Sequence, residues 1–146
     1  MSTIALFLLA LVVSAIATFT DIKERKIPNN LIYAGIAAAI VLRIIYPPLH
    51  WGIYFVGFLP AVAMYLVTLF KGHFGMGDIK LALFLGIIFG GGAPFALVAI
   101  TFVLMIFWKL IQMFVPVGRE SVPMAPFFFL STMILMFING SMRLVM

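Results

Sequence analysis

The sequence predicts an all-α fold, a polytopic membrane helix bundle with six transmembrane helices in a single domain over residues 1–146. The first observation is composition: 66% of the residues are hydrophobic and 9% are charged, whereas an ordinary soluble domain carries about 25% charged residues. A soluble domain of this size could not bury so much apolar surface. The second is that the apolar residues form six runs, each close to the ~20 residues that cross about 30 Å of hydrocarbon as a helix.

The first three runs are bounded by charged or helix-ending residues. The first has no basic residue ahead of it and is followed by the basic cluster Lys23, Arg25 and Lys26, which favours a membrane helix over a cleaved signal peptide. Pro47-Pro48 ends the second run, and Lys71 follows the third. We therefore expect transmembrane helices over residues 2–20, 31–46 and 51–70.

The last three runs are bounded by glycines and prolines. Gly90-Gly91-Gly92 separates the fourth helix from the fifth, and Pro94 suits the first turn of the fifth. Val122-Pro123 and Pro126-Phe127 mark the entry to the sixth. We expect these helices over residues 79–93, 94–113 and 122–139.

Basic residues are distributed unevenly between the two ends of such a bundle. The first, third and fifth connections, with the helix ends beside them, hold seven: Lys23, Arg25, Lys26, Lys71, Lys80, Lys109 and Arg119. The other end holds Arg43 and Arg143. Cytoplasmic loops carry an excess of Lys and Arg, so we expect these three connections in the cytoplasm and both termini on the non-cytoplasmic side.

Several kinds of chemistry are disfavoured. The chain has no cysteine, which excludes thiol catalysis and cysteine-based metal sites, and its two histidines lie in separate loops. We therefore expect neither a metal nor a cofactor. The net charge of +5 is spread between apolar runs, which indicates membrane topology and contact with membrane lipid and not nucleic-acid binding.

The four acidic residues, Asp21, Glu24, Asp78 and Glu120, all belong to the predicted cytoplasmic side. Each has an ordinary interpretation. Asp21 could be a solvated loop acid paired with a neighbouring base, and Asp78 could be a helix N-cap. Glu24 lies in a charged run, and Glu120 adjoins Arg119.

The two aspartates together support a more specific interpretation. The fourth helix is so short that Asp78 must approach the membrane boundary, while Asp21 follows the end of the first helix. If these helices touch, the two carboxyls can share one proton, one activating a water and the other donating a hydrogen bond to a carbonyl. Helix dipoles alone would place the shared proton on Asp21 and the negative charge on Asp78.

The same residues resemble a known family. Gly75-Met76-Gly77-Asp78 is similar to the Gly-x-Gly-Asp motif of intramembrane aspartyl proteases. Its extension through Lys80, with Asp21 followed by Ile27-Pro28-Asn29, resembles the type IV prepilin peptidases, as do the prolines that precede the last helix. The resemblance implies a catalytic pair of Asp21 and Asp78, supported by Gly75 and Gly77.

The resemblance also implies an activity and a place in the cell. Such peptidases remove the short basic leader of pilin-like precursors at the cytoplasmic face of a prokaryotic inner membrane, for type IV pili and protein secretion. The chain lacks the large cytoplasmic insertion and the cysteines of bifunctional members, so N-methyltransferase activity is not expected. It is similar to the compact peptidases of Tad/Flp systems.

Three further residues are candidates for support. Lys80 lies about 200° around the helix from Asp78, so we expect it to snorkel or to meet an acidic substrate residue. Pro28 and Asn29 are expected to set the start of the second helix, with Asn29 or Asn30 as its cap. The alternatives to a peptidase are a small transporter or channel, or a non-catalytic membrane subunit of a secretion machine.

Overall fold

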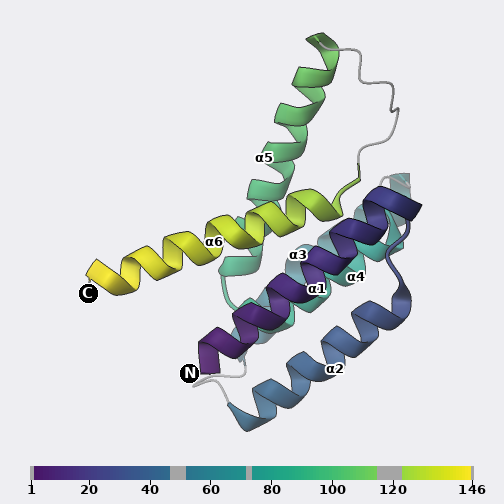
Figure 1. Ribbon diagram of the computed structural model, residues 1–146. Helices are drawn as coiled ribbons and strands as arrows, with labels where there is room; N and C mark the ends of the chain where they lie inside the picture. Colours follow the sequence, from purple (N-terminus) through teal and green to yellow (C-terminus); the bar gives the residue numbers. More distant parts are fainter. Residues whose placement is uncertain (1, 47–51, 72–73, 115–122, 146) are drawn as a thin grey trace.

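The computed structural model describes residues 2–46, 52–71, 74–114 and 123–145, and within these ranges the chain forms helices and no strand. Six helices follow one another along the sequence (Figure 1). They are α1 (Ser2–Glu24), α2 (Asn29–Ile45), α3 (Gly52–Lys71), α4 (Met76–Phe89), α5 (Ala93–Phe114) and α6 (Ala125–Val145). The order and number agree with the prediction from apolar runs.

Several helix ends differ from the prediction. α1 continues to Glu24 and stops where Arg25 takes a positive φ of 53°, so Asp21 lies in its last turn. α4 begins at Met76, earlier than expected, and ends before Gly90, which has a φ of 61°. α6 covers Ala125–Val145 instead of 122–139. An apolar run identifies only the hydrophobic part of a helix. The helical backbone can continue into residues beyond that run, so the ends of a helix can differ from the ends of the run.

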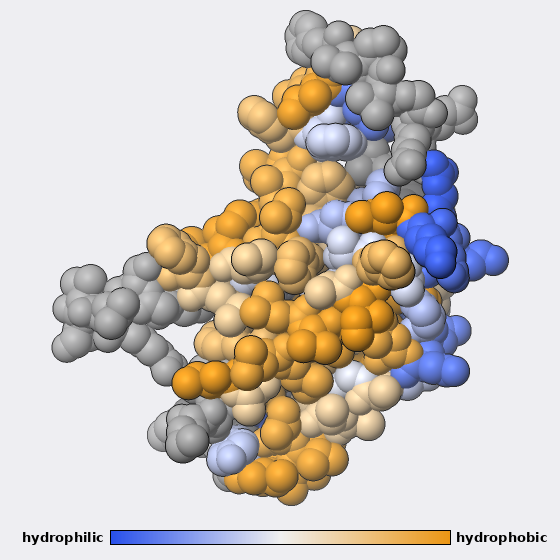
Figure 2. Space-filling view, viewed as in Figure 1, coloured by the Kyte–Doolittle hydropathy of each residue, from blue (hydrophilic) through white to orange (hydrophobic). Residues whose placement is uncertain are grey.

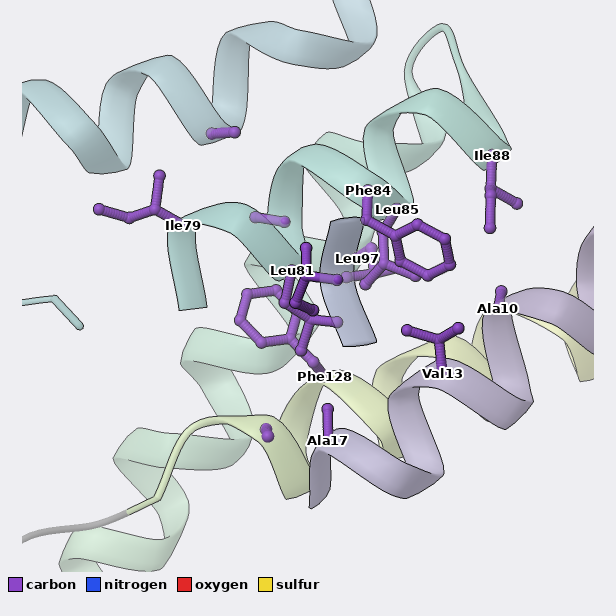
Figure 3. Packing of buried hydrophobic residues seen from close by; sticks show 14 of the residues in the cluster. Ala10, Val13, Ala17, Ile79, Leu81, Phe84, Leu85, Ile88, Leu97 and Phe128 are labelled. Carbon is purple, nitrogen blue, oxygen red and sulfur yellow. The ribbon is translucent and has the colours of Figure 1, made fainter. Parts of the chain in front are cut away.

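The centre of the molecule is α4, which packs against each of the other five helices. None of residues 77–89 is exposed, which explains why this helix is apolar all round. Figure 3 shows side chains of α4 meeting Ala10, Val13 and Ala17 of α1 and Phe128 of α6. The backbones of α3 and α4 come so close that a Cβ on Gly86 would lie 2.6 Å from the Gly57 carbonyl oxygen.

The outer surface of the bundle is apolar along its helices and polar at one end. Phe70, Met113 and Phe137 have 85%, 79% and 78% of their surface exposed. Figure 2 shows hydrophobic residues in orange along the helices and a cluster of hydrophilic residues in blue at the end where α1 stops and α2 starts. By length and composition, Ile4–Glu24 and Ala93–Met113 are able to cross a membrane, and three other apolar helices are shorter. A surface this apolar suits lipid contact.

Candidate active site

Asp21 lies in the last turn of α1 and keeps only 8% of its surface exposed. Its Oδ2 accepts a hydrogen bond of 3.1 Å from the backbone N–H of Ala125, the first residue of α6. Burial raises the pKa of this carboxyl above its ordinary value, while the N–H groups of Ala125 and Met124 and the charge of Arg25 act in the opposite direction. The carboxylate is therefore buried but well provided with partners.

The start of α6 explains why a distant carboxyl is needed there. The carbonyl of Met124 accepts the N–H groups of Phe127 and Phe128, at 3.0 and 3.2 Å. Pro126 has no N–H, and the N–H of Ala125 has no acceptor within the helix because it belongs to the first turn. Asp21 supplies it and so caps α6 from another helix.

Asp78 is the third residue of α4, whose N-cap is Gly75. The prediction that Asp78 itself could be the N-cap is wrong. Its carboxyl instead turns back toward Gly75, whose N–H donates to it, as the acidic residue of a capping box does. A Cβ on Gly75 would lie 2.9 Å from Asp78 Oδ2, so any larger residue would require the carboxyl to move.

In the structure, Asp21 and Asp78 are close enough for the charge of Asp21 to act on the Asp78 carboxyl. Burial and, second, the negative charge of Asp21 raise the pKa of Asp78 from 3.8 to about 7. The raised pKa of Asp78 favours the opposite order to the one expected from helix dipoles, with the shared proton on Asp78. At Asp21, the N–H donors of Ala125 and Met124 and the charge of Arg25 oppose the larger rise in pKa that burial causes.

The first connection packs directly on the start of α4. A Cβ on Gly77 would lie 3.1 Å from the Cβ of Ile27, so the second glycine of the motif lets this loop approach. Pro28 is the N-cap residue of α2, and its carbonyl accepts the N–H of Ile32 at 3.4 Å. No side chain caps α2, so the expectation of an Asn29 or Asn30 cap is wrong.

Asn29 has a different partner. Its Oδ1 accepts a hydrogen bond of 2.8 Å from Lys80 Nζ. The same Nζ donates to the Tyr33 hydroxyl at 3.1 Å and lies 5.1 Å from the centre of the Tyr33 ring. Lys80 therefore joins α4 to the first turns of α2 in the described structure.

The sequence reasoning missed the backbone of Met124 and Ala125 and the contact with Tyr33. The prolines at positions 123 and 126 were the feature of the sequence that could have drawn attention to the backbone at the start of α6, because proline has no N–H. Glu120, His50 and His73 lie outside the described residues. Among the residues that are described, no group of three or more His, Asp or Glu is arranged to hold a metal ion.

Comparison with known proteins identifies a family. The sequence profile of the type IV leader peptidase family, whose members are membrane-associated peptidases of the aspartic type, matches residues 6–141. The match includes both aspartates, the first connection and the start of α6. Comparisons with curated proteins and with solved structures gave no significant match. Because the profile covers most of the chain, the protein belongs to the type IV leader peptidase family.

Proposed function

We propose that this protein is a membrane aspartic endopeptidase that removes the short N-terminal leader of type IV prepilin-like precursors at the cytoplasmic face of a prokaryotic inner membrane. The observation that carries the proposal is the coupling of Asp21 and Asp78, with the pKa of Asp78 raised to about 7. A pair that holds one proton near neutral pH contains both a base and an acid. Peptide hydrolysis without a metal requires that combination.

The chemistry needs one carboxylate and one carboxylic acid on either side of a peptide bond. The carboxylate takes a proton from water, whose oxygen then attacks the carbonyl carbon. The carboxylic acid donates a hydrogen bond to the carbonyl oxygen as negative charge develops there. When the tetrahedral intermediate collapses, the C–N bond breaks and the leaving nitrogen takes the proton held by the base.

The substrate reaches this pair from the polar end of the bundle. The apolar helix of the substrate has no exposed side chain of α4 to contact over residues 77–89. On α1, Phe19 and Ile22 are exposed by 67% and 49% close to Asp21. We therefore propose that the precursor helix lies along α1 and unwinds at its polar end.

The alternatives receive less support. Among the described residues, the acidic side chains are Asp21, Glu24 and Asp78, and all three lie near the polar end. A transporter generally needs an ionisable group within the bundle. A non-catalytic subunit would not require two coupled carboxyls.

The test is a gel-shift assay of pilin-like precursors with basic leaders, using wild type, Asp21→Asn and Asp78→Asn in the same membranes. We expect wild type to cleave and both variants to lose cleavage. The amide introduced by Asp21→Asn still offers an oxygen to the Ala125 N–H, so the fold should survive. Glu24→Gln, an exposed acid of the same segment, is the matched control and should cleave. Cleavage by either Asn variant would rule out the pair.

A further inference from the structure

We infer that the N-terminus of α6 is a third part of the active site: the backbone N–H of Ala125 holds Asp21 as the carboxylate, which makes Asp21 the base and Asp78 the acid. Ala125 acts through Asp21 and is a positioning residue. The inference rests on the proposed function and adds to it an order of roles and a device that enforces them.

The geometry of the contact supports this assignment. Ala125 is fully buried and Asp21 nearly so, and the hydrogen bond between them is 3.1 Å long. A hydrogen bond from an N–H to a carboxylate is stronger than one to the neutral acid, and burial away from water increases the difference. The contact therefore favours the ionised form of Asp21 over its protonated form.

Asp78 has a less favourable environment for a negative charge. Its carboxyl accepts a hydrogen bond from the N–H of Gly75 and is repelled by the negative charge of Asp21. Asp21 accepts hydrogen bonds from two N–H groups at the start of α6 and is stabilised by the positive charge of Arg25. A single proton shared by the pair consequently settles on Asp78. Asp21 then takes the proton from water, and Asp78 donates to the carbonyl oxygen.

The chain contains a matched pair of positions for the test. α6 begins Ala125-Pro126-Phe127, and α5 begins Ala93-Pro94-Phe95. In α5 the Gly92 carbonyl accepts the N–H groups of Phe95 and Ala96 at 3.1 and 3.3 Å, as the Met124 carbonyl accepts those of Phe127 and Phe128 in α6. Proline is well tolerated at the first position of a helix, so Ala125→Pro removes the donor to Asp21 and Ala93→Pro makes the same change at the other end.

We expect Ala125→Pro to shift the acidic limb of the kcat–pH profile to higher pH by about one unit, because loss of a donor raises the pKa of a carboxyl. KM should change little, since the contact does not touch the substrate. Ala93→Pro should keep the wild-type profile. A merely structural role for Ala125 would lower activity at every pH without moving the limb.

A folded Ala125→Pro variant with an unchanged profile would overturn the inference. If the proline prevents folding, lactic acid incorporated in place of Ala125 removes the N–H without adding a ring, and the same shift is expected. An unchanged profile in the ester variant would overturn it equally. These outcomes differ from failure of the proposed function, which would appear as full cleavage by Asp21→Asn and Asp78→Asn.

Discussion

At the scale of single residues, the two aspartates differ only through their neighbours. Asp21 meets Ala125, 104 residues away in sequence, and is close to Arg25. Asp78 meets the N–H of Gly75 beside its own helix and faces the charge of Asp21. The pairing could be predicted, because the chain has only these two aspartates, each at the end of an apolar run. Their order could not, because it depends on backbone donors that no residue type reveals.

The raised pKa of Asp78 predicts how stability depends on pH. Below 3.8, the ordinary pKa of an aspartate, Asp78 is protonated in both the folded and the unfolded state, so it does not lower the free energy of unfolding. As the pH rises toward about 7, the unfolded chain releases this proton and the folded chain keeps it, so stability falls and then levels off. Asp78→Asn should remove a penalty on the order of 4 kcal/mol at pH 8 and little at pH 4.

Thermal unfolding in detergent micelles at pH 4 and pH 8 measures this effect. Asp78→Asn should unfold at a higher temperature than wild type at pH 8, and the gap should narrow at pH 4. Glu24→Gln is the control for removing an acid from the same end of the molecule. An equal gap at both pH values would mean that Asp78 is not desolvated in the folded protein.

At the scale of elements, the start of α4 and the first connection form one fitted unit. Gly75 leaves room for the Asp78 carboxyl, and Gly77 leaves room for Ile27. The bond of 2.8 Å between Lys80 and Asn29 joins the same two segments. The Gly-x-Gly-Asp and Ile-Pro-Asn segments are therefore packing partners, which places the connection that follows α1 against α4.

Gly77→Ala tests this fit. Its new Cβ would lie 3.1 Å from the Cβ of Ile27, so Ile27 must move by a few tenths of an ångström, which we expect to disturb the packing of the first connection on α4. We expect cleavage to fall by about tenfold and stability by about 1–3 kcal/mol, as for overpacking in a core. The measurements are kcat for a pilin-like precursor and thermal unfolding.

Gly52→Ala is the matched control, because no atom lies within 4 Å of a Cβ at that position, at the start of α3. It should behave as wild type. Equal behaviour of Gly77→Ala and Gly52→Ala would show that the loop does not depend on the close approach at Gly77.

The helices themselves could be predicted in number and order but not at their ends. Apolar runs identify segments that are buried or lie in the membrane, and the six runs correspond to the six helices. The extension of α1 through Asp21 and the start of α4 at Met76 involve residues at the polar end, which continue a helix without lengthening an apolar run. Asn29 shows the same limit, because its expected capping role was replaced by a contact with Lys80 from another helix.

At the scale of the whole molecule, the short central helix bears on where the proposed active site lies. α4 has 14 residues and is only about 21 Å long at 1.5 Å per residue. The other five helices pack against it, and Asp78 in its first turn is only partly exposed. The proposed site therefore lies at the polar end, where water is available for the proposed hydrolysis, and burial there raises the pKa of the Asp78 carboxyl.

The bias of basic residues predicts that this polar end faces the cytoplasm. Because the chain has no cysteine, single cysteines can be introduced without background: Lys26→Cys at the polar end, and Gly92→Cys at the other end, where no atom lies within 4 Å of a Cβ. In intact cells, a membrane-impermeant maleimide should label Gly92→Cys alone, and Lys26→Cys should react only after permeabilisation. Both variants should still cleave precursor. The reverse labelling pattern would place Asp21 and Asp78 outside the cell, where they would meet the leader only after it had crossed the membrane.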